Sequence, residues 1–351
     1  MNHQYYNVIG IMSGTSLDAI DIAYLRLVRN HHWSFQFLKT KSVAYSPRWK
    51  KKLRDAFLLN DGELQQLNSD YTFYLGNQIK LFIENEKLKD VLAVCSHGHT
   101  VFHKPELNYT LQIGNLPEIA KIIGVRTVCD FRVQDVMLGG QGAPLVPIGD
   151  QLLFAQYDYC LNLGGFANIS SDVNGIRVAY DIAPVNVVLN HFANLLGADY
   201  DDKGAFAKAG NINSTVLNQL NNLDFYNLKA PKSLGIEWVN TYIWSVLATI
   251  NEPYDALATY TEHVAIQIAR CLKMYSKVLV TGGGAYNEHL INRIKFHGKV
   301  ELIIPQPELV EYKEALIFAL LGVLRLRNEN NCLASVTGAS KDHSSGDIYL
   351  P

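Results

Sequence analysis

Residues 8–27 read VIGIMSGTSLDAIDIAYLRL, and this stretch gives the first indication of the fold. Two apolar runs flank the short polar segment SGTS at 13–16, a pattern typical of two strands joined by a tight turn. A third strand is predicted at 33–44, and amphipathic helices are predicted at 48–59 and 63–85. Because strands and helices continue to alternate, we expect the first part of the chain to form a layered α/β domain.

The second half of the chain opens with the same pattern. Strands are predicted at 159–163, 166–171 and 176–181, and Gly164-Gly165 forms the first turn. Few residues match between the halves, so the similarity lies in the pattern and predicts a duplicated α/β unit with a cleft between the copies. We place the first domain at 1–156 and the second at 157–309, and expect 310–351 to pack back on the first domain.

Composition limits the classes of function. The chain has 351 residues, 48% of them hydrophobic, which is enough for two cores. Its net charge is −2 and no basic stripe stands out, so neither a nucleic acid nor a membrane surface is an expected partner. No signal peptide or membrane span is recognised, and the five cysteines include no C-x-x-C pair. These features predict a soluble cytoplasmic protein with reduced, mostly buried cysteines.

Three glycine-rich turns are candidates for binding the phosphates and the nucleoside of ATP. They are the 13–16 turn, Gly164-Gly165, and the run Gly282-Gly283-Gly284 after a predicted strand at 278–281. Small residues let backbone N–H groups approach a polyanion closely. The sequence contains neither a Walker A loop nor a dinucleotide fingerprint. Each turn alone would also suit an ordinary hairpin, but their corresponding positions in the two halves predict a nucleotide site.

Phosphoryl transfer also requires carboxylates that hold Mg²⁺ and activate the nucleophile. Asp18 follows the first turn and is the candidate for Mg²⁺. Asp181 is predicted at the end of a strand, before a helix expected from Pro184. Its side chain could act as a general base, or it could cap that helix.

The segment SHGHTVFH at 96–103 contains three histidines but no carboxylate or cysteine of its own, and no zinc site is predicted there or elsewhere. His97 or Thr100 could instead hydrogen-bond to a substrate. Arg132, just past a predicted buried strand, could bind a substrate carboxylate or form a local ion pair.

Taken in order, several motifs resemble those of the anhydro-N-acetylmuramic acid kinase family, which belongs to the superfamily of acetate and sugar kinases, heat-shock chaperone ATPases and actin. The resemblance runs nearly from end to end. The matching strings are GIMSGTSLD (10–18), CSHGHTVFH (95–103), LQIG (111–114), DFRVQD (130–135), GGQGAPLVP (139–147), NLGGFANIS (162–170), PKSLG (231–235), TGGGAYN (281–287), EALIFALLG (314–322) and SVTGA (335–339). The first string and the DFRVQD–GGQGAP pair are the most specific.

The resemblance implies duplicated actin-like, ribonuclease H-like domains with ATP and Mg²⁺ in the cleft. It implies hydrolytic opening of 1,6-anhydro-N-acetylmuramic acid with phosphorylation at O6, giving N-acetylmuramic acid 6-phosphate and ADP in peptidoglycan recycling. A homodimer is also expected by resemblance. The implied residue roles are a catalytic base at Asp181, ATP and metal contacts at Ser13, Gly14, Thr15, Ser16, Asp18, Gly164, Gly165, Gly282, Gly283 and Gly284, and sugar contacts at His97, Thr100, Arg132 and Glu314.

The chain departs from the family pattern at several positions. Residues 181–186 read DIAPVN where the family usually has DTGPGN, and Ala19 replaces the usual glycine. Two alternatives therefore stay open: a catalytically impaired sensor that binds ATP and sugar, and a kinase for a different sugar. A filament-forming or peptide-holding ATPase has less support, because the chain has no room for a separate peptide-binding domain.

Overall fold

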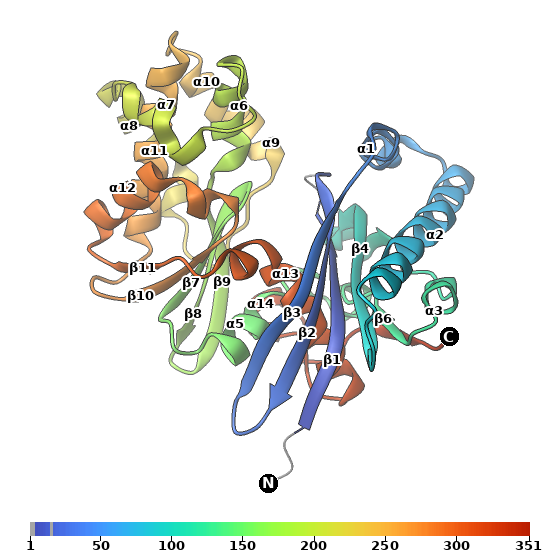
Figure 1. Cartoon of the computed structure of the whole chain (residues 1–351). Helices are drawn as coiled ribbons and strands as arrows, with labels where there is room; N and C mark the ends of the chain where they lie inside the picture. Colours follow the sequence, from blue (N-terminus) through green and yellow to red (C-terminus); the bar gives the residue numbers. More distant parts are fainter. Residues whose placement is uncertain (1–3, 15–16) are drawn as a thin grey trace. The chain divides into compact units, whose positions relative to one another are not determined.

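A computed structural model describes residues 4–14 and 17–351 of the chain (Figure 1). The chain divides into two compact units. Unit 1 contains Met1–Leu153 and Tyr312–Pro351, and unit 2 is the continuous segment Phe154–Glu311. Within the part of the chain that the structure describes, no helix is long and apolar enough to cross a membrane.

Unit 1 is built on one sheet, whose described strands run in the order β12-β6-β4-β1-β2-β3, with β5 paired to β4. The first three strands form an antiparallel meander, and β4 and β6 extend it in parallel. The strands are β1 (Gln4–Ser13), β2 (Ala19–Arg29), β3 (Trp33–Ala44), β4 (Ala93–Lys104), β5 (Tyr109–Ile113), β6 (Thr127–Cys129) and β12 (Asp347–Tyr349).

The helices of unit 1 begin where the sequence provides caps. Ser46 accepts the N–H of Trp49 ahead of a first-turn proline, and Asn60 forms a reciprocal capping box with Glu63. The helices are α1 (Pro47–Arg54), α2 (Asp61–Asn85), α3 (Glu118–Ile123), α4 (Val133–Met137), α5 (Pro147–Leu153), α13 (Pro307–Leu326, which starts before the unit boundary) and α14 (Ala334–Thr337), with 3-10 turns at Ala56–Leu58 and Pro105–Leu107.

Alternation along β1 determines what covers each face of this sheet. Ile9 and Ile11 belong to a buried cluster that includes Tyr71 of α2. Gly10 faces the other side, where a Cβ atom would collide with the backbone carbonyl of Ala315 in α13. A glycine is therefore required for α13 to lie this close to the sheet.

Unit 2 repeats the same arrangement. Its sheet has the order β11-β10-β7-β8-β9, with an antiparallel meander β7–β9 and parallel β10 and β11. The strands are β7 (Tyr159–Leu163), β8 (Phe166–Val173), β9 (Ile176–Pro184), β10 (Lys277–Thr281) and β11 (Glu301–Ile303).

The helix α11 (Pro253–Arg270) organises the helical layer of unit 2, because most of its residues are buried and it contacts α6, α7, α8 and α12 (Figure 1). Its Leu257, Tyr260 and Val264 join the strand residues in one apolar core. The other helices are α6 (Asn186–Leu195), α7 (Ala205–Ala209), α8 (Ser214–Asn221), α9 (Ile236–Trp238), α10 (Trp244–Leu247) and α12 (Glu288–Gly298), with a π-helical turn at Val239–Ile243 and 3-10 turns at Asp202–Gly204, Asp224–Asn227 and Gly283–Tyr286.

Three sequence-based boundaries need correction. The helix predicted at 48–59 ends at Arg54 and gives way to a 3-10 turn. The apolar run at 91–96 predicts a short strand there, but β4 continues to Lys104, because antiparallel pairing with β5 extends it. The strand predicted to end at Asp181 continues to Pro184, because Phe166 and Ala167 of β8 pair with its last residues.

Candidate functional site

Asp181 lies inside β9, and its carboxylate holds a neighbouring loop. Its Oδ2 accepts the backbone N–H of Leu234 at 2.8 Å, and its own N–H donates to the carbonyl of Lys232 at 3.0 Å. Burial raises the pKa of the Asp181 carboxyl, and the hydrogen bond from Leu234 opposes part of this rise. The alternative role as a helix cap is wrong, since the N-cap of α6 is Val185. Asp181 is thus a half-buried carboxylate with raised basicity.

The Gly164-Gly165 turn packs against the start of α6. The carbonyl of Gly165 accepts the N–H of Val185 at 2.8 Å, and the carbonyl of Gly164 accepts the N–H of Asn186 at 3.3 Å. Gly165 is exposed. The turn therefore lies beside the segment that leads from Asp181 into the helix.

The second glycine run of unit 2 also reaches this place. Gly282 has φ +82°, and a Cβ on it or on Gly284 would collide with Leu163. Gly283 is exposed, and the nearest atom to an added Cβ is Nδ2 of Asn186 at 4.0 Å. Asn186 also donates to the carbonyl of Leu163 at 3.2 Å. Unit 2 thus gathers both of its glycine turns around the first residue of α6.

The first glycine turn belongs to unit 1. Thr15 and Ser16, both predicted to bind ATP, lie outside the described residues. Gly14 accepts the N–H of Leu17 at 3.3 Å, and Asp18 is exposed immediately before β2. The carbonyl of Asp18 accepts the N–H of Tyr45. Asp18 therefore has a fixed backbone and an accessible carboxylate, as a metal ligand would need.

Ser13 belongs to a buried network that the sequence did not reveal. Its hydroxyl contacts Tyr45 Oη at 2.7 Å and His99 Nδ1 at 3.2 Å, and it accepts from Tyr71 Oη at 2.9 Å. Burial raises the pKa of Tyr45 to about 12 and lowers the pKa of His99 to about 4, so all these groups are neutral near pH 7. Because its hydroxyl is committed to this network, we assign Ser13 the role of anchoring the turn.

Arg132 and His97, both predicted to contact a sugar, hold each other in unit 1. The Nδ1–H of His97 donates to the carbonyl of Gly98 at 2.9 Å, which leaves Nε2 to accept Nε–H of Arg132 at 3.0 Å. Arg132 also donates to the carbonyl of Gly142 at 2.6 Å. Burial and the positive charge of Arg132 keep the pKa of His97 well below its ordinary value. His97 therefore acts as a neutral acceptor that orients the guanidinium.

Two further predicted sugar contacts lie in the same unit. Glu314 on α13 is exposed. Burial lowers the pKa of Arg132, and the negative charge of Glu314 opposes part of this lowering. The hydroxyl of Thr100 accepts from Gln112 at 3.4 Å. The structure thus brings Arg132 together with His97 and Glu314, whereas Thr100 pairs with Gln112 of β5.

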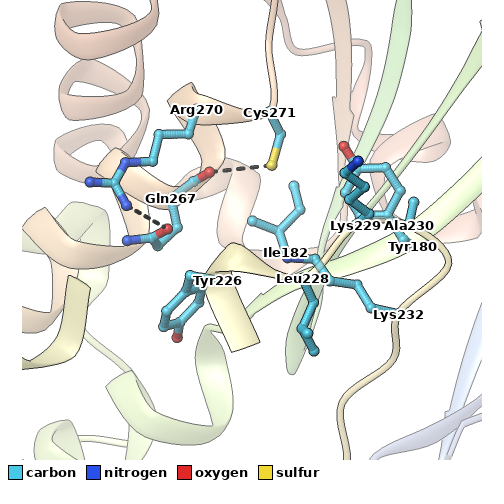
Figure 2. Close-up of a pocket in the computed structure, with 10 residues that line it drawn as sticks. All are labelled: Tyr180, Ile182, Tyr226, Leu228, Lys229, Ala230, Lys232, Gln267, Arg270 and Cys271. Atoms are coloured by element: carbon cyan, nitrogen blue, oxygen red, sulfur yellow. Dashed lines mark hydrogen bonds between the residues drawn. The ribbon is translucent and has the colours of Figure 1, made fainter. Parts of the chain in front are cut away.

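A separate pocket of about 340 Å³ lies in unit 2 (Figure 2). Tyr180 and Ile182, the neighbours of Asp181 in β9, line it, whereas Asp181 does not. Its lining residues are Tyr180, Ile182, Tyr226, Leu228, Lys229, Ala230, Lys232, Gln267, Arg270 and Cys271. Three of these are cationic, so the pocket suits an anion, but it does not include the carboxylate or the glycine turns.

The two sheets define the class of protein. Both contain an antiparallel meander followed by two parallel strands, β3-β2-β1-β4-β6 in unit 1 and β9-β8-β7-β10-β11 in unit 2. This shared order confirms the prediction of a duplicated actin-like α/β protein. The chain belongs to the anhydro-N-acetylmuramic acid kinase family, because the model of that family matches residues 6–351.

Two relatives share this membership, and one solved structure is similar to the chain over most of its length. Anhydro-N-acetylmuramic acid kinase of Mannheimia succiniciproducens is 35% identical over 99% of this chain and 100% of its own length. The enzyme of the same name from Saccharophagus degradans is 33% identical over 98% of both chains. Component A of the (R)-2-hydroxyglutaryl-CoA dehydratase of Acidaminococcus fermentans has a TM-score of 0.46 at 15% identity, covering 90% of this chain and 96% of its own.

Proposed function

We propose that this protein is an ATP-dependent kinase that opens 1,6-anhydro-N-acetylmuramic acid and phosphorylates it in peptidoglycan recycling. Water attacks C1, the C1–O6 bond breaks, and O6 takes the γ-phosphoryl group. The products are N-acetylmuramic acid 6-phosphate and ADP. The family match over residues 6–351 is the observation that carries this proposal.

Asp181 is the proposed base that takes the proton from the attacking water. A base works best when its pKa lies closer to the operating pH than that of an exposed carboxylate, and burial raises the pKa of Asp181 in that direction. The bond from Leu234 to Oδ2 fixes the carboxylate without a countercharge. This support is specific to a proton-accepting role, since a paired carboxylate would have a lowered pKa.

The altered loop after Asp181 favours an active enzyme over a sensor. Glycine would be required at positions 183 and 185 if the backbone were left-handed there. Ala183 instead lies in β9, and Val185 has φ −126°. Both side chains are fully buried in the core of unit 2. Neither position therefore requires glycine on the ground of a left-handed backbone, although Val185 has an unusual ψ of −91°, and both side chains belong to the apolar core behind Asp181.

The glycine turns fit a nucleotide. Gly165 and Gly283 are exposed. A Cβ atom added to Gly283 would have no neighbouring atom closer than Nδ2 of Asn186 at 4.0 Å. We propose that these residues and Gly164, Gly282 and Gly284 bind ATP, together with Gly14 to Asp18 in unit 1. Asp18 is the proposed contact for Mg²⁺, which neutralises phosphate charge when bound.

The sugar is proposed to contact His97, Thr100, Arg132 and Glu314. An oriented guanidinium suits the carboxylate that distinguishes muramic acid from other amino sugars. His97 and the carbonyl of Gly142 fix Arg132 before the substrate arrives, which lowers the entropy cost of binding.

A coupled ADP-release assay tests the assignment. We expect turnover with 1,6-anhydro-N-acetylmuramic acid and none above background with glucose or N-acetylglucosamine. Binding of ATP and the anhydro-sugar without ADP release would refute the kinase and support a sensor. Turnover with glucose but not with the anhydro-sugar would show that the protein is a kinase for a different sugar. The homodimer and the cytoplasmic location stay predictions, which sedimentation and fractionation can test.

A further inference from the structure

Three buried side chains of ligand type meet in unit 1, although they are far apart in the sequence. Asp135 comes from α4, and Cys332 and His343 flank the C-terminal helix α14. Their carboxylate, thiol and imidazole atoms all lie within 4.8 Å of one another. The residues are 0%, 1% and 4% exposed. None of them has a part in the proposed kinase reaction.

His343 presents an unused nitrogen to this cluster. Its Nδ1 lies 3.1 Å from the carbonyl of Lys341, so Nδ1 carries the proton and donates it. Its Nε2 is buried without a hydrogen-bond partner and lies 3.6 Å from Oδ1 of Asp135. A histidine that donates one ring N–H to a backbone carbonyl and keeps the other nitrogen bare has the usual arrangement of a metal ligand.

Asp135 brings a buried carboxylate with spare acceptor capacity. Oδ1 accepts from the hydroxyl of Thr337 and Oδ2 from the N–H of Gly142, both at 2.7 Å. Both donors are neutral, and a carboxylate can accept about four hydrogen bonds or metal contacts. Such partners orient a carboxylate ligand without competing for its charge.

The C-terminal segment holds its two ligands in place independently of Asp135. Cys332 and His343 form a backbone bridge, with Cys332 N–H to His343 O at 3.1 Å and the reverse bond at 3.2 Å. The side chain of Asn331 also accepts the N–H of Ser345 at 2.7 Å. The cluster is therefore preorganised from both sides.

We propose that Asp135, Cys332 and His343 bind one divalent metal ion of the zinc class. Sulfur, imidazole and carboxylate ligands suit tetrahedral zinc, whose ligand atoms lie about 3.3–3.6 Å apart when bond lengths are about 2.0–2.3 Å. The observed 3.6 Å between His343 and Asp135 already matches this separation. A water molecule completes the fourth position, and the Cys332 thiol releases its proton on binding. This assignment departs from the sequence-based expectation of no zinc site, which considered only histidines close in sequence.

The bound ion would tie the end of the chain to the loop that holds Arg132. Asp135 accepts from Gly142, and the carbonyl of Gly142 accepts from Arg132. The site thus has a structural role beneath the residues that we propose for sugar binding.

Metal analysis of the untagged full-length protein tests the proposal. We expect about one zinc per chain after gel filtration, and a lower unfolding temperature after stripping with a strong chelator. Titrating the stripped protein with Co²⁺ should give thiolate-to-cobalt charge transfer and the visible absorption of a tetrahedral site. Cys332→Ser should abolish the charge-transfer band, and His343→Gln should weaken metal binding by more than about 100-fold, beyond the usual cost of losing a supporting partner.

Matched controls are Cys271→Ser and the exposed His31→Gln, which lie outside the cluster and should retain the metal. A wild-type protein without zinc and without a cobalt spectrum would overturn the proposal and leave a neutral hydrogen-bonded cluster. Zinc that remains in both cluster variants would be bound elsewhere and would also overturn it. If a variant fails to fold, the cobalt spectrum of the wild type still decides.

Discussion

Replacing Asp181 with asparagine is the most direct test of the proposed chemistry. The asparagine carbonyl can still accept the N–H of Leu234, so the loop that Asp181 holds should remain in place. Only the basic oxygen is lost. General-base catalysis contributes about 10²–10⁴-fold in rate, which corresponds to about 2.7–5.4 kcal/mol of transition-state stabilisation. We expect kcat for ADP release to fall by this amount, while the calorimetric affinity for ATP changes little.

Asp172→Asn provides the control. Asp172 lies in the neighbouring strand β8 and, like Asp181, accepts a backbone N–H, here from Gly175 at 2.8 Å, but it is exposed. Its variant should keep the wild-type kcat. A kcat for Asp181→Asn within about threefold of wild type would refute the assignment of Asp181 as the base.

Three further predictions concern binding and stability. Gly283→Val should weaken ATP binding in calorimetry without lowering the unfolding temperature, whereas Gly284→Val should destabilise the protein because its side chain meets Leu163; unchanged ATP affinity in the first variant would remove Gly283 from the site. Arg132→Lys should raise KM for the anhydro-sugar about tenfold or more, because an ammonium cannot reproduce the planar fork, and an unchanged KM would contradict sugar binding there. Burial raises the pKa of Glu262, but hydrogen bonds from Arg293 and His297 outweigh it, so the pKa is lowered. The stability that Glu262 contributes is present above its ordinary pKa of 4.5 and is lost as the pH falls towards the lowered value; Glu262→Gln should flatten this part of a melting-temperature profile.

The strand pattern could be predicted from the sequence because each meander consists of consecutive segments joined by short turns. The strand at 33–44 was predicted with its observed bounds, and β7 likewise. The sequence predicted the end of a strand less well where pairing with a strand outside the meander determines that end. Pairing with β5 extends β4, and β12 reaches β6 from the other end of the chain.

The candidate site was predictable to the extent that its residues lie in motifs. The sequence indicated Asp181, the glycine turns and Arg132. It gave no sign that Ser13 would be buried beneath Tyr45 and Tyr71, because these tyrosines come from separate elements. The cluster at Asp135 was missed for the same reason, since no spacing rule links residues two hundred positions apart.

The return of α13 to the first sheet has a consequence for synthesis on the ribosome. Unit 2 is continuous, so all its residues are synthesised before the segment Tyr312–Pro351. Unit 1 begins first, but Gly10 and Cys95 pack against Ala315 and Gly322 of α13, and β6 pairs with β12 at the end of the chain. We therefore expect one apolar face of the N-terminal sheet to stay uncovered until α13 and β12 have left the ribosome. A released fragment 1–311 should be protease-resistant in unit 2 and sensitive in the N-terminal sheet.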